Sequence, residues 1–213
     1  MNPRGSMLSK PWKSRALLLR VAYFVFLAGG VLGIGYAGYV VVDAQAYQAI
    51  EESRLPEIRP SPGPRVVVEG DVIGEIRIPR LELKVIVVQG GSPKALRRAV
   101  GHLPATALPG EPGNVVLAGH RDTFFRPLRS IQLGDRITFK TVDGEFEYLV
   151  ESTEVVLPSD VQVLQPSSDR ILTLVTCFPF YYVGAAPKRF IVRARQVGRL
   201  PAQSFSAEAP LHL

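Results

Sequence analysis

Thr173-Leu174-Val175-Thr176-Cys177-Phe178-Pro179-Phe180 is a β-favouring run that contains the only cysteine of the chain. Four residues of this kind precede the thiol, and an aromatic residue and a proline interrupt the run directly behind it. An apolar run of this length is typical of a buried strand, and here it would carry a nucleophile to the strand end. A lone cysteine is more often a small buried hydrophobic residue than a catalyst. The catalytic interpretation therefore depends on the rest of the chain.

The composition indicates a folded chain with an uneven charge distribution. The 213 residues fit one domain with appendages, and 46% hydrophobic residues with a mean hydropathy of +0.15 exclude disorder of the whole chain. The net charge of +6 could indicate nucleic-acid binding, but much of the excess comes before the first acidic residue, in Arg4, Lys10, Lys13, Arg15 and Arg20. A basic head before an apolar run is an orientation signal for a membrane segment, so we expect no nucleic-acid partner.

The stretch from Val21 to Val42 contains no charged residue and is flanked by Arg20 and Asp43. At about 1.5 Å per residue, such a helix is long enough to cross a hydrocarbon core of roughly 30 Å. We expect an uncleaved, single-pass signal anchor in the cell membrane, with the N-terminus in the cytoplasm and the following chain outside. A cleaved signal peptide is the alternative, although its apolar core would be shorter and no clean small-x-small site follows.

Changes in composition divide the rest of the chain. The expected segments are a cytoplasmic basic segment 1–20, a transmembrane anchor 21–42, a stalk 43–65, a β-rich domain 66–200 and a loosely ordered tail 201–213. The first half of the stalk is compatible with a helix, and four prolines, at 56, 60, 62 and 64, make its second half extended and stiff.

Short β-favouring runs separated by Gly, Pro and Asp fill the β-rich domain. The expected strands are Ile73–Ile78, Leu83–Val88, Asn114–Ala118, Arg136–Thr141, Glu145–Leu157 with a bend, Ile171–Thr176 and Arg189–Val197. Asp143-Gly144 predicts a hairpin turn. Residues 92–100 read as a short helix with Ser92 as N-cap and Gly101 past its end, and Phe125–Ile131 is compatible with a helical turn. This spacing predicts a mainly β fold, a closed or nearly closed barrel with one or two short helices.

The histidines are His102, His120 and His212. His120 follows the β-run Asn114–Ala118, so it also lies at a strand end. A thiol needs a nearby proton acceptor or cation to be a good nucleophile, and an oxyanion needs donors, for which Arg189 is a candidate. Outside the cytoplasm, Cys177 would have no disulfide partner in its own chain, which favours a reactive role. Three scattered histidines and one cysteine make a zinc site unexpected, and we predict no metal and no cofactor.

Three segments resemble the sortase family of cysteine transpeptidases. Thr173–Cys177 is similar to the family's TLxTC signature, Leu117–Thr123 to its catalytic-histidine segment, and Lys188–Val192 to the strand that carries its essential arginine. The segments Gly101–Pro104 and Pro109–Asn114 are also similar to sortases, and the texture is closest to class D. The resemblance covers roughly Ile73 to Arg195 and implies an eight-stranded, sortase-type catalytic barrel over residues 66–200.

The resemblance also implies roles for individual residues. Cys177 would attack the Thr–Gly amide of a C-terminal sorting signal similar to LPXTG and form a thioester. His120 would protonate the leaving amine and later deprotonate the incoming amine of a cell-wall precursor or pilin-like subunit. Arg189 would hold the substrate and stabilise the oxyanion. Thr176 would support the substrate groove.

Several residues have competing interpretations. His102, in a turn between Gly101 and Pro104, is either a substrate-groove residue or, as we favour, a structural one. Asp122 could orient the imidazole of His120, but so close in sequence it is better placed to stabilise a local turn. Arg126 and Arg193 are candidate anion contacts that read better as surface charges.

Two other functions use the same residues. An extracytoplasmic thiol endopeptidase would hand the acyl group to water, and an inactive, membrane-tethered barrel would only bind peptides. The order of the three motifs behind a membrane anchor favours the transpeptidase.

Overall fold

The computed structural model describes residues 11–55, 67–182 and 184–200. The chain divides into an N-terminal unit up to Asp43 and a second unit from Ala44. Three expectations lie outside the described residues: the first ten residues of the basic segment, the stalk prolines, and the tail with His212.

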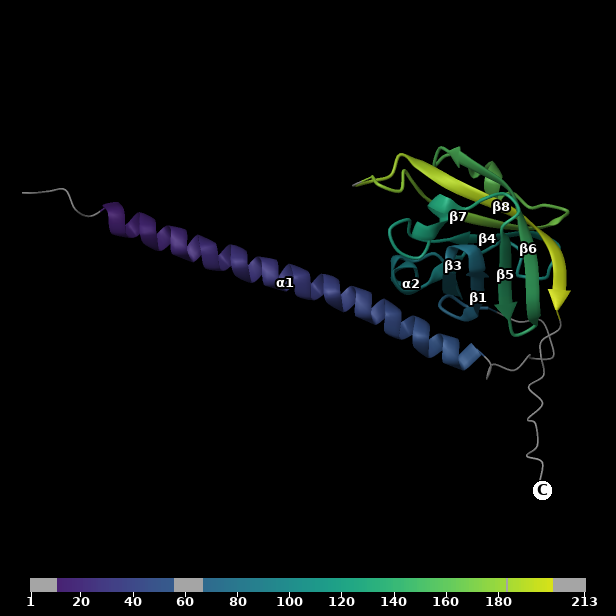
Figure 1. Cartoon of the computed structure of the whole chain (residues 1–213), viewed down its shortest axis with the longest axis horizontal. Helices are drawn as coiled ribbons and strands as arrows, with labels where there is room; N and C mark the ends of the chain where they lie inside the picture. The colour runs from purple at the N-terminus through teal and green to yellow at the C-terminus, as the bar shows by residue number, and fades with distance from the viewer. Residues whose placement is uncertain (1–10, 56–66, 183, 201–213) are drawn as a thin grey trace, which may run out of the picture. The chain divides into compact units, whose positions relative to one another are not determined.

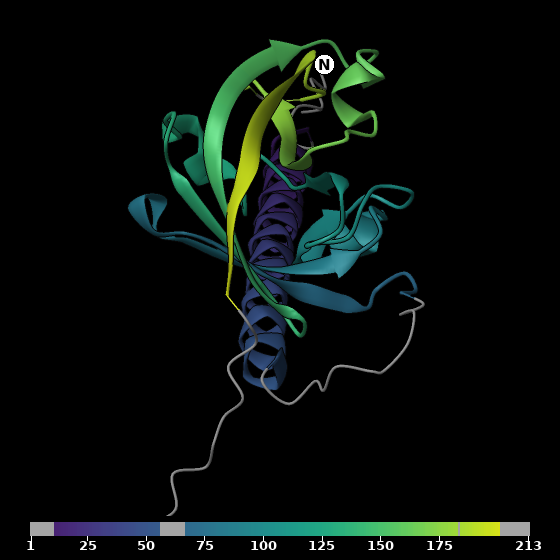
Figure 2. The ribbon, with the colours of Figure 1, turned by 90° about the vertical axis from the view of Figure 1, so that its right-hand side faces the viewer.

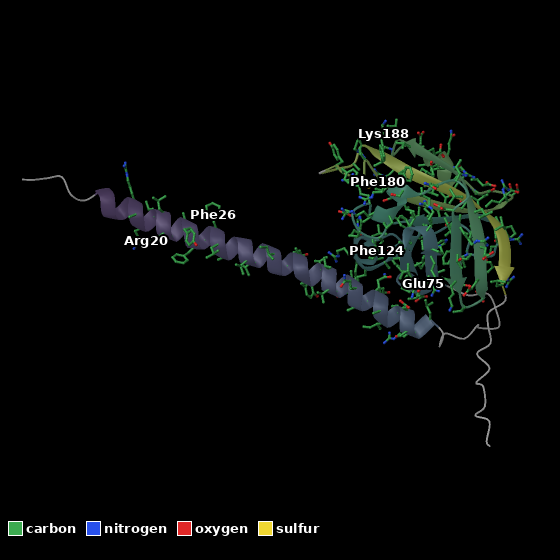
Figure 3. The ribbon with its side chains drawn as sticks, in the orientation of Figure 1. Arg20, Phe26, Glu75, Phe124, Phe180 and Lys188 are labelled. Atoms are coloured by element: carbon green, nitrogen blue, oxygen red, sulfur yellow. The ribbon has the colours of Figure 1, made fainter. Side chains whose placement is uncertain are left out.

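Helix α1 (Pro11–Arg54) contains the whole apolar stretch Val21–Val42. It is long and apolar enough to cross a membrane by length and composition. Its apolar side chains project from the helix, and Phe26, labelled in Figure 3, is 81% exposed. An exposed apolar helix surface is unfavourable in water, so these side chains make the segment a candidate for a membrane span. The helix continues beyond Asp43 to Arg54, so the first half of the predicted stalk is helical.

Eight strands form a closed barrel in the order β1-β2-β3-β4-β7-β8-β6-β5, which confirms the predicted fold class (Figures 1 and 2). Their bounds are β1 Val72–Ile78, β2 Leu83–Gln89, β3 Val100–His102, β4 Gly113–Ala118, β5 Arg136–Thr141, β6 Gly144–Val156, β7 Arg170–Phe178 and β8 Lys188–Leu200. The connections hold helix α2 (Pro93–Arg98) and the 3₁₀ turns η2 (Pro79–Leu81), η3 (Arg126–Ser130) and η4 (Val161–Leu164).

The interior of the barrel is a single apolar cluster. Alternate residues of each strand point inward, because successive side chains of a strand lie on opposite faces. Its fully buried members include Ile76, Leu117, Phe139, Phe146, Tyr148, Leu172, Leu174 and Val192. This packed core is the platform on which the strand ends hold the polar side chains described below.

Two details of the β5–β6 ribbon refine the prediction. Strand β6 has the expected bend, since its pairing with β8 shifts between Glu147 and Tyr148 and again between Val150 and Ser152. The β5–β6 hairpin forms, but Gly144 already pairs with Thr141 as the first residue of β6. The turn therefore lies one residue earlier than Asp143-Gly144.

The short helix α2 ends earlier than predicted, and the strand that follows it was not predicted. Ser92 is its N-cap, and its hydroxyl accepts a hydrogen bond from the Ala95 amide at 3.3 Å. The helix stops at Arg98, and Gly101 lies inside β3 instead of capping a helix. A Cβ atom at Gly101 would lie 2.2 Å from the Gly90 carbonyl oxygen, so the glycine serves a close approach of two backbones.

Candidate active site

Strands β4 and β7 run parallel, so their carboxyl ends meet at one edge of the barrel. The register pairs Ala118 with Val175, and the Gly119 amide continues the ladder by donating to the Val175 carbonyl at 3.1 Å. Two residues further along each chain, this register brings His120 to the level of Cys177. The hydroxyl of Thr176 donates to the Gly119 carbonyl at 2.8 Å and fixes the two strand ends to each other.

Arg189 lies directly opposite Cys177. Strands β7 and β8 are antiparallel, and the register pairs Cys177 with Arg189. Opposed residues of an antiparallel pair share one face of the sheet. Because Leu174 and Val192 point into the core, Cys177 and Arg189 lie on the outer face. The register thus brings Cys177 and Arg189, on β7 and β8, and His120, in the turn after β4, to one edge of the barrel.

His120 begins the turn after β4 and is exposed. The Phe125 amide donates to the His120 carbonyl at 3.0 Å, which closes this turn. Gly119 allows the turn to pass over the fully buried Phe125, since a Cβ there would lie 2.7 Å from that ring. Together with the bond from Thr176, these contacts fix the backbone on both sides of the imidazole.

Cys177 is half-buried, and so is Arg189 opposite it. Nη1 of Arg189 donates to the Ala186 carbonyl at 3.2 Å and to its neighbour Lys188 at 2.9 Å. Within the described part of the chain, its other N–H groups form no hydrogen bond. An arginine held at one nitrogen can direct its remaining donors to a carbonyl or an oxyanion.

An aromatic cluster supports this edge from the inner face. Phe178, Phe180 and Phe190 pack with ring centroids 5.4 to 6.4 Å apart. Phe180 and Phe190 also contact the barrel core. Figure 3 labels Phe180 and Lys188 near the two ends of the β7–β8 loop, on the same side of the barrel in this view as Phe124. The loop that joins Cys177 to Arg189 therefore begins and ends on packed rings.

The connection between β6 and β7 covers the outer face further along β4. The side-chain amide of the buried Asn114 donates to the carbonyls of Val163 and Gln165 at 3.1 and 3.2 Å, and its oxygen accepts from Thr173 at 2.7 Å. These bonds fix η4 over the sheet beside the outer-face residues of β7. Asn114 carries no role predicted from the sequence, although an amide within an apolar β-run is a signal for a buried, hydrogen-bonded side chain.

The surroundings of His102 differ from those of the residues at this edge. It is 1% exposed, its Nε2–H donates to the Ala107 carbonyl at 2.9 Å, and its Nδ1 lies 2.8 Å from Oε1 of Gln89. Burial lowers the pKa of this imidazole, and the Ala107 carbonyl opposes that shift in part. A ring enclosed in this way has the surroundings of a structural residue.

Two of the remaining candidates are exposed and the third, Arg193, is half-buried. Asp122 and Arg126 are exposed, and neither forms a hydrogen bond to His120 within the described residues. Arg193 lies two residues beyond Ile191 on β8, opposite Thr173. Arg121 received no role from the sequence, yet it makes the most extensive side-chain contacts next to His120. Its partners are 61 and 63 residues away in sequence, so no local pattern indicates them.

The comparisons with known proteins agree on one family. The family model described as "Sortase domain" matches residues 76–197. Sortase D of Bacillus subtilis is 30% identical over 195 residues, which cover 84% of this chain and 98% of that protein. A sortase D5 transpeptidase from Clostridium perfringens is 32% identical, with a TM-score of 0.58 over 62% of this chain and 83% of that one.

A sortase C structure gives a similar match. Sortase C1 of Streptococcus agalactiae is 30% identical, with a TM-score of 0.57 over 62% of this chain and 71% of that one. The region matched by the family model contains His120, Cys177 and Arg189. It also contains the parallel β4–β7 pair and the antiparallel β7–β8 pair, which bring these residues to one edge. The chain therefore belongs to the sortase family of cysteine transpeptidases.

Proposed function

We propose that Cys177, His120 and Arg189 are the catalytic residues of this sortase. The observation that supports this assignment is the strand register, which pairs Cys177 with Arg189 and brings His120 to the same edge. A thiol, an imidazole and a guanidinium on one outer face supply a nucleophile, a proton donor or acceptor, and an oxyanion contact.

The reaction follows from these groups. The Cys177 thiolate attacks the carbonyl carbon of the scissile amide, and the developing oxyanion is stabilised by Arg189. The C–N bond breaks as His120 donates a proton to the departing amine, which leaves a thioester. An incoming amine then attacks the thioester, His120 accepts its proton, and the thiolate leaves with its electron pair.

The substrates in this proposal are a protein with an LPXTG-like C-terminal sorting signal and an amine from a cell-wall precursor or a pilin-like subunit. Sortases are membrane-associated, and α1 supplies one candidate span. In the proposed topology the N-terminus is cytoplasmic and the barrel is extracytoplasmic, because the basic residues precede the span. We propose Thr176 and His102 as structural supports of the site, since the hydrogen bonds of both go to the protein itself.

The decisive experiment traps the thioester. The full chain is incubated with an LPXTG peptide and analysed by intact mass spectrometry, with and without an added amine. We expect an acyl adduct on the wild-type chain and none on Cys177→Ala. An adduct on the alanine variant would contradict the assignment, and a product mixture unaffected by the amine would favour the endopeptidase alternative.

A further inference from the structure

The loop between β7 and β8 is held by an arginine from the histidine segment. Nη2 of Arg121 donates to the backbone carbonyls of Tyr182 and Gly184 at 2.5 and 3.0 Å. The same guanidinium lies 5.8 Å from the centroid of the Tyr182 ring. Two charge-assisted hydrogen bonds and a cation–π contact thus join this one side chain to the loop.

A second arginine repeats the contact one residue earlier in the loop. Nη1 of Arg129 donates to the Tyr181 hydroxyl at 2.8 Å, and its guanidinium lies 5.6 Å from that ring. Tyr181 is 78% exposed, so solvent weakens this contact. The Arg121 hydrogen bonds also lie at the surface, but Nη1 of Arg121 is buried and has no hydrogen-bond partner in the described part of the chain. Keeping a guanidinium in that position has a desolvation cost, which the loop contacts offset.

The position of this contact connects all three proposed catalytic residues. Arg121 directly follows His120, while the loop begins after the β7 strand end with Cys177 and finishes before Arg189. A contact between the histidine turn and the loop therefore constrains the imidazole relative to the paired thiol and guanidinium. The planar fork of arginine can bind two carbonyls at once, whereas a lysine ammonium binds as a single point.

We propose that Arg121 is a positioning residue, which holds the β7–β8 loop against the His120 turn and so aligns His120 with Cys177 and Arg189 for acyl transfer. This inference rests on the proposed roles of those three residues. Arg121 acts through the backbone that it holds, without contacting the substrate.

A direct substrate contact by Arg121 is the competing role, and its kinetic signature differs. Arg121 also lines a pocket of about 500 Å³ with Asp122, Arg126, Phe180 and Tyr181. If a peptide were bound there through Arg121, its loss would raise KM. If Arg121 aligns the catalytic groups, its loss lowers kcat and leaves KM nearly unchanged.

The test uses the full chain in detergent, a fluorogenic LPXTG peptide, and titration of the single thiol to count reactive sites. For Arg121→Ala we expect kcat per reactive thiol to fall about tenfold, the order expected for a lost charge-assisted hydrogen bond, with KM within about twofold. Arg97→Ala is the matched control, because Arg97 is an exposed arginine on α2. Arg121→Lys should recover only part of kcat.

A double-mutant cycle identifies the partner. Tyr182→Ala removes the ring that faces Arg121 but keeps the backbone carbonyl, so the cycle isolates the cation–π part of the contact. For that part, the combined loss in Arg121→Ala/Tyr182→Ala should be smaller than the product of the single losses. Multiplicative losses would remove the Tyr182 ring from the contact and leave the two backbone carbonyls as its basis. A rise in KM with kcat intact, or a kcat equal to that of Arg97→Ala, would overturn the proposal. The proposal would also fail if the lower kcat of Arg121→Ala were explained entirely by fewer reactive thiols or by a lower melting temperature. If Cys177→Ala still formed the acyl adduct, the catalytic assignment itself would fail, whatever Arg121 does.

Discussion

Arg189 is positioned so that a change from arginine to lysine separates charge from geometry. Its register position opposite Cys177 places the guanidinium on the outer face, where Nη1 is held by the loop and other donors remain. In Arg189→Lys the charge stays but the fork is lost, so we expect kcat/KM for the sorting peptide to fall on the order of 100-fold. Steady-state peptide cleavage measures this ratio.

Arg193→Lys is the control for that change. Arg193 lies on the same strand, and its register position opposite Thr173 places it on the same face. We expect its kcat/KM to remain within about threefold of the wild type. An equal loss in both variants would show that any arginine on this face matters, and would remove the special role of Arg189.

His102 makes stability depend on pH. Its folded pKa lies below the ordinary value of 6.5, with burial as the main cause, so the folded state favours the neutral ring. The unfolded chain then binds more protons as pH falls, and the free energy of unfolding decreases from about pH 6.5 downward. In His102→Gln this slope should be absent, although the variant is less stable at neutral pH. Urea unfolding from pH 7.5 to 5 tests it, and an unchanged slope in the variant would assign the effect to other groups.

At the residue scale, the sequence predicts the positions of the strand-end residues better than the contacts of their neighbours. Cys177, His120 and Arg189 each adjoin a long apolar run, so their common edge follows once the β4–β7 pairing is assumed. Arg121 instead contacts a loop that lies more than 60 residues later in the sequence. No pattern in the residues around Arg121 indicates that contact. The same holds for His102, whose partners come from β2 and from the turn after β3.

At the element scale, periodicity predicts the long strands and fails for the shortest one. Strands β1, β2, β4 and β5 begin and end within a residue of their expected bounds, because each is rich in β-favouring residues and is followed by turn residues or a change in composition. Strand β3 spans only Val100–His102 and exists because β2 and β4 pair with it on either side. The prediction that Gly101 ends a helix is therefore wrong. Its role is to let the backbone of β3 lie close to the Gly90 carbonyl.

The last turns of α1 within the second unit dock on the barrel. Oε1 of Gln48 accepts from the Ile86 amide at 2.7 Å, and its Nε2 donates to the Arg98 carbonyl at 2.6 Å. Strand β3 pairs with β2 only from Val87 onward, so Gln48 serves an amide that the sheet leaves open. Leu55 adds an apolar contact to the cluster that contains Ile86.

Replacing Gln48 should therefore weaken this docking locally. In Gln48→Ala the Ile86 amide loses its acceptor, and we expect a loss of stability of about 1–3 kcal/mol, with faster hydrogen exchange at that amide. Hydrogen exchange of the β2 peptide, followed by mass spectrometry, measures the local effect. Gln45→Ala is the control, since Gln45 is exposed on the same helix. Equal exchange in both variants would mean that the docked end opens independently of Gln48.

At the scale of the whole molecule, the single cysteine makes membrane topology measurable. The apolar part of α1 follows the basic residues, so we expect Cys177 on the extracytoplasmic side. A membrane-impermeant maleimide should label the wild-type chain in right-side-out membrane vesicles and label inside-out vesicles only after detergent is added. Labelling with the opposite preference would place the barrel in the cytoplasm, where a sortase would have no access to an envelope acceptor.

The same design decides between an anchor and a cleaved signal peptide. In a chain that carries both Ser6→Cys and Cys177→Ser, the only thiol lies ahead of the span, so it should label from inside-out vesicles and stay with the full-length protein. Cleavage after the apolar stretch would remove this thiol, and the mature barrel would carry no label. Because α1 continues without a break from Pro11 to Arg54, a cut within it would sever the membrane segment from the turn that Gln48 fixes to the barrel. Retention of the label on the full-length chain would therefore establish that the docked end of α1 and the membrane anchor remain one continuous polypeptide.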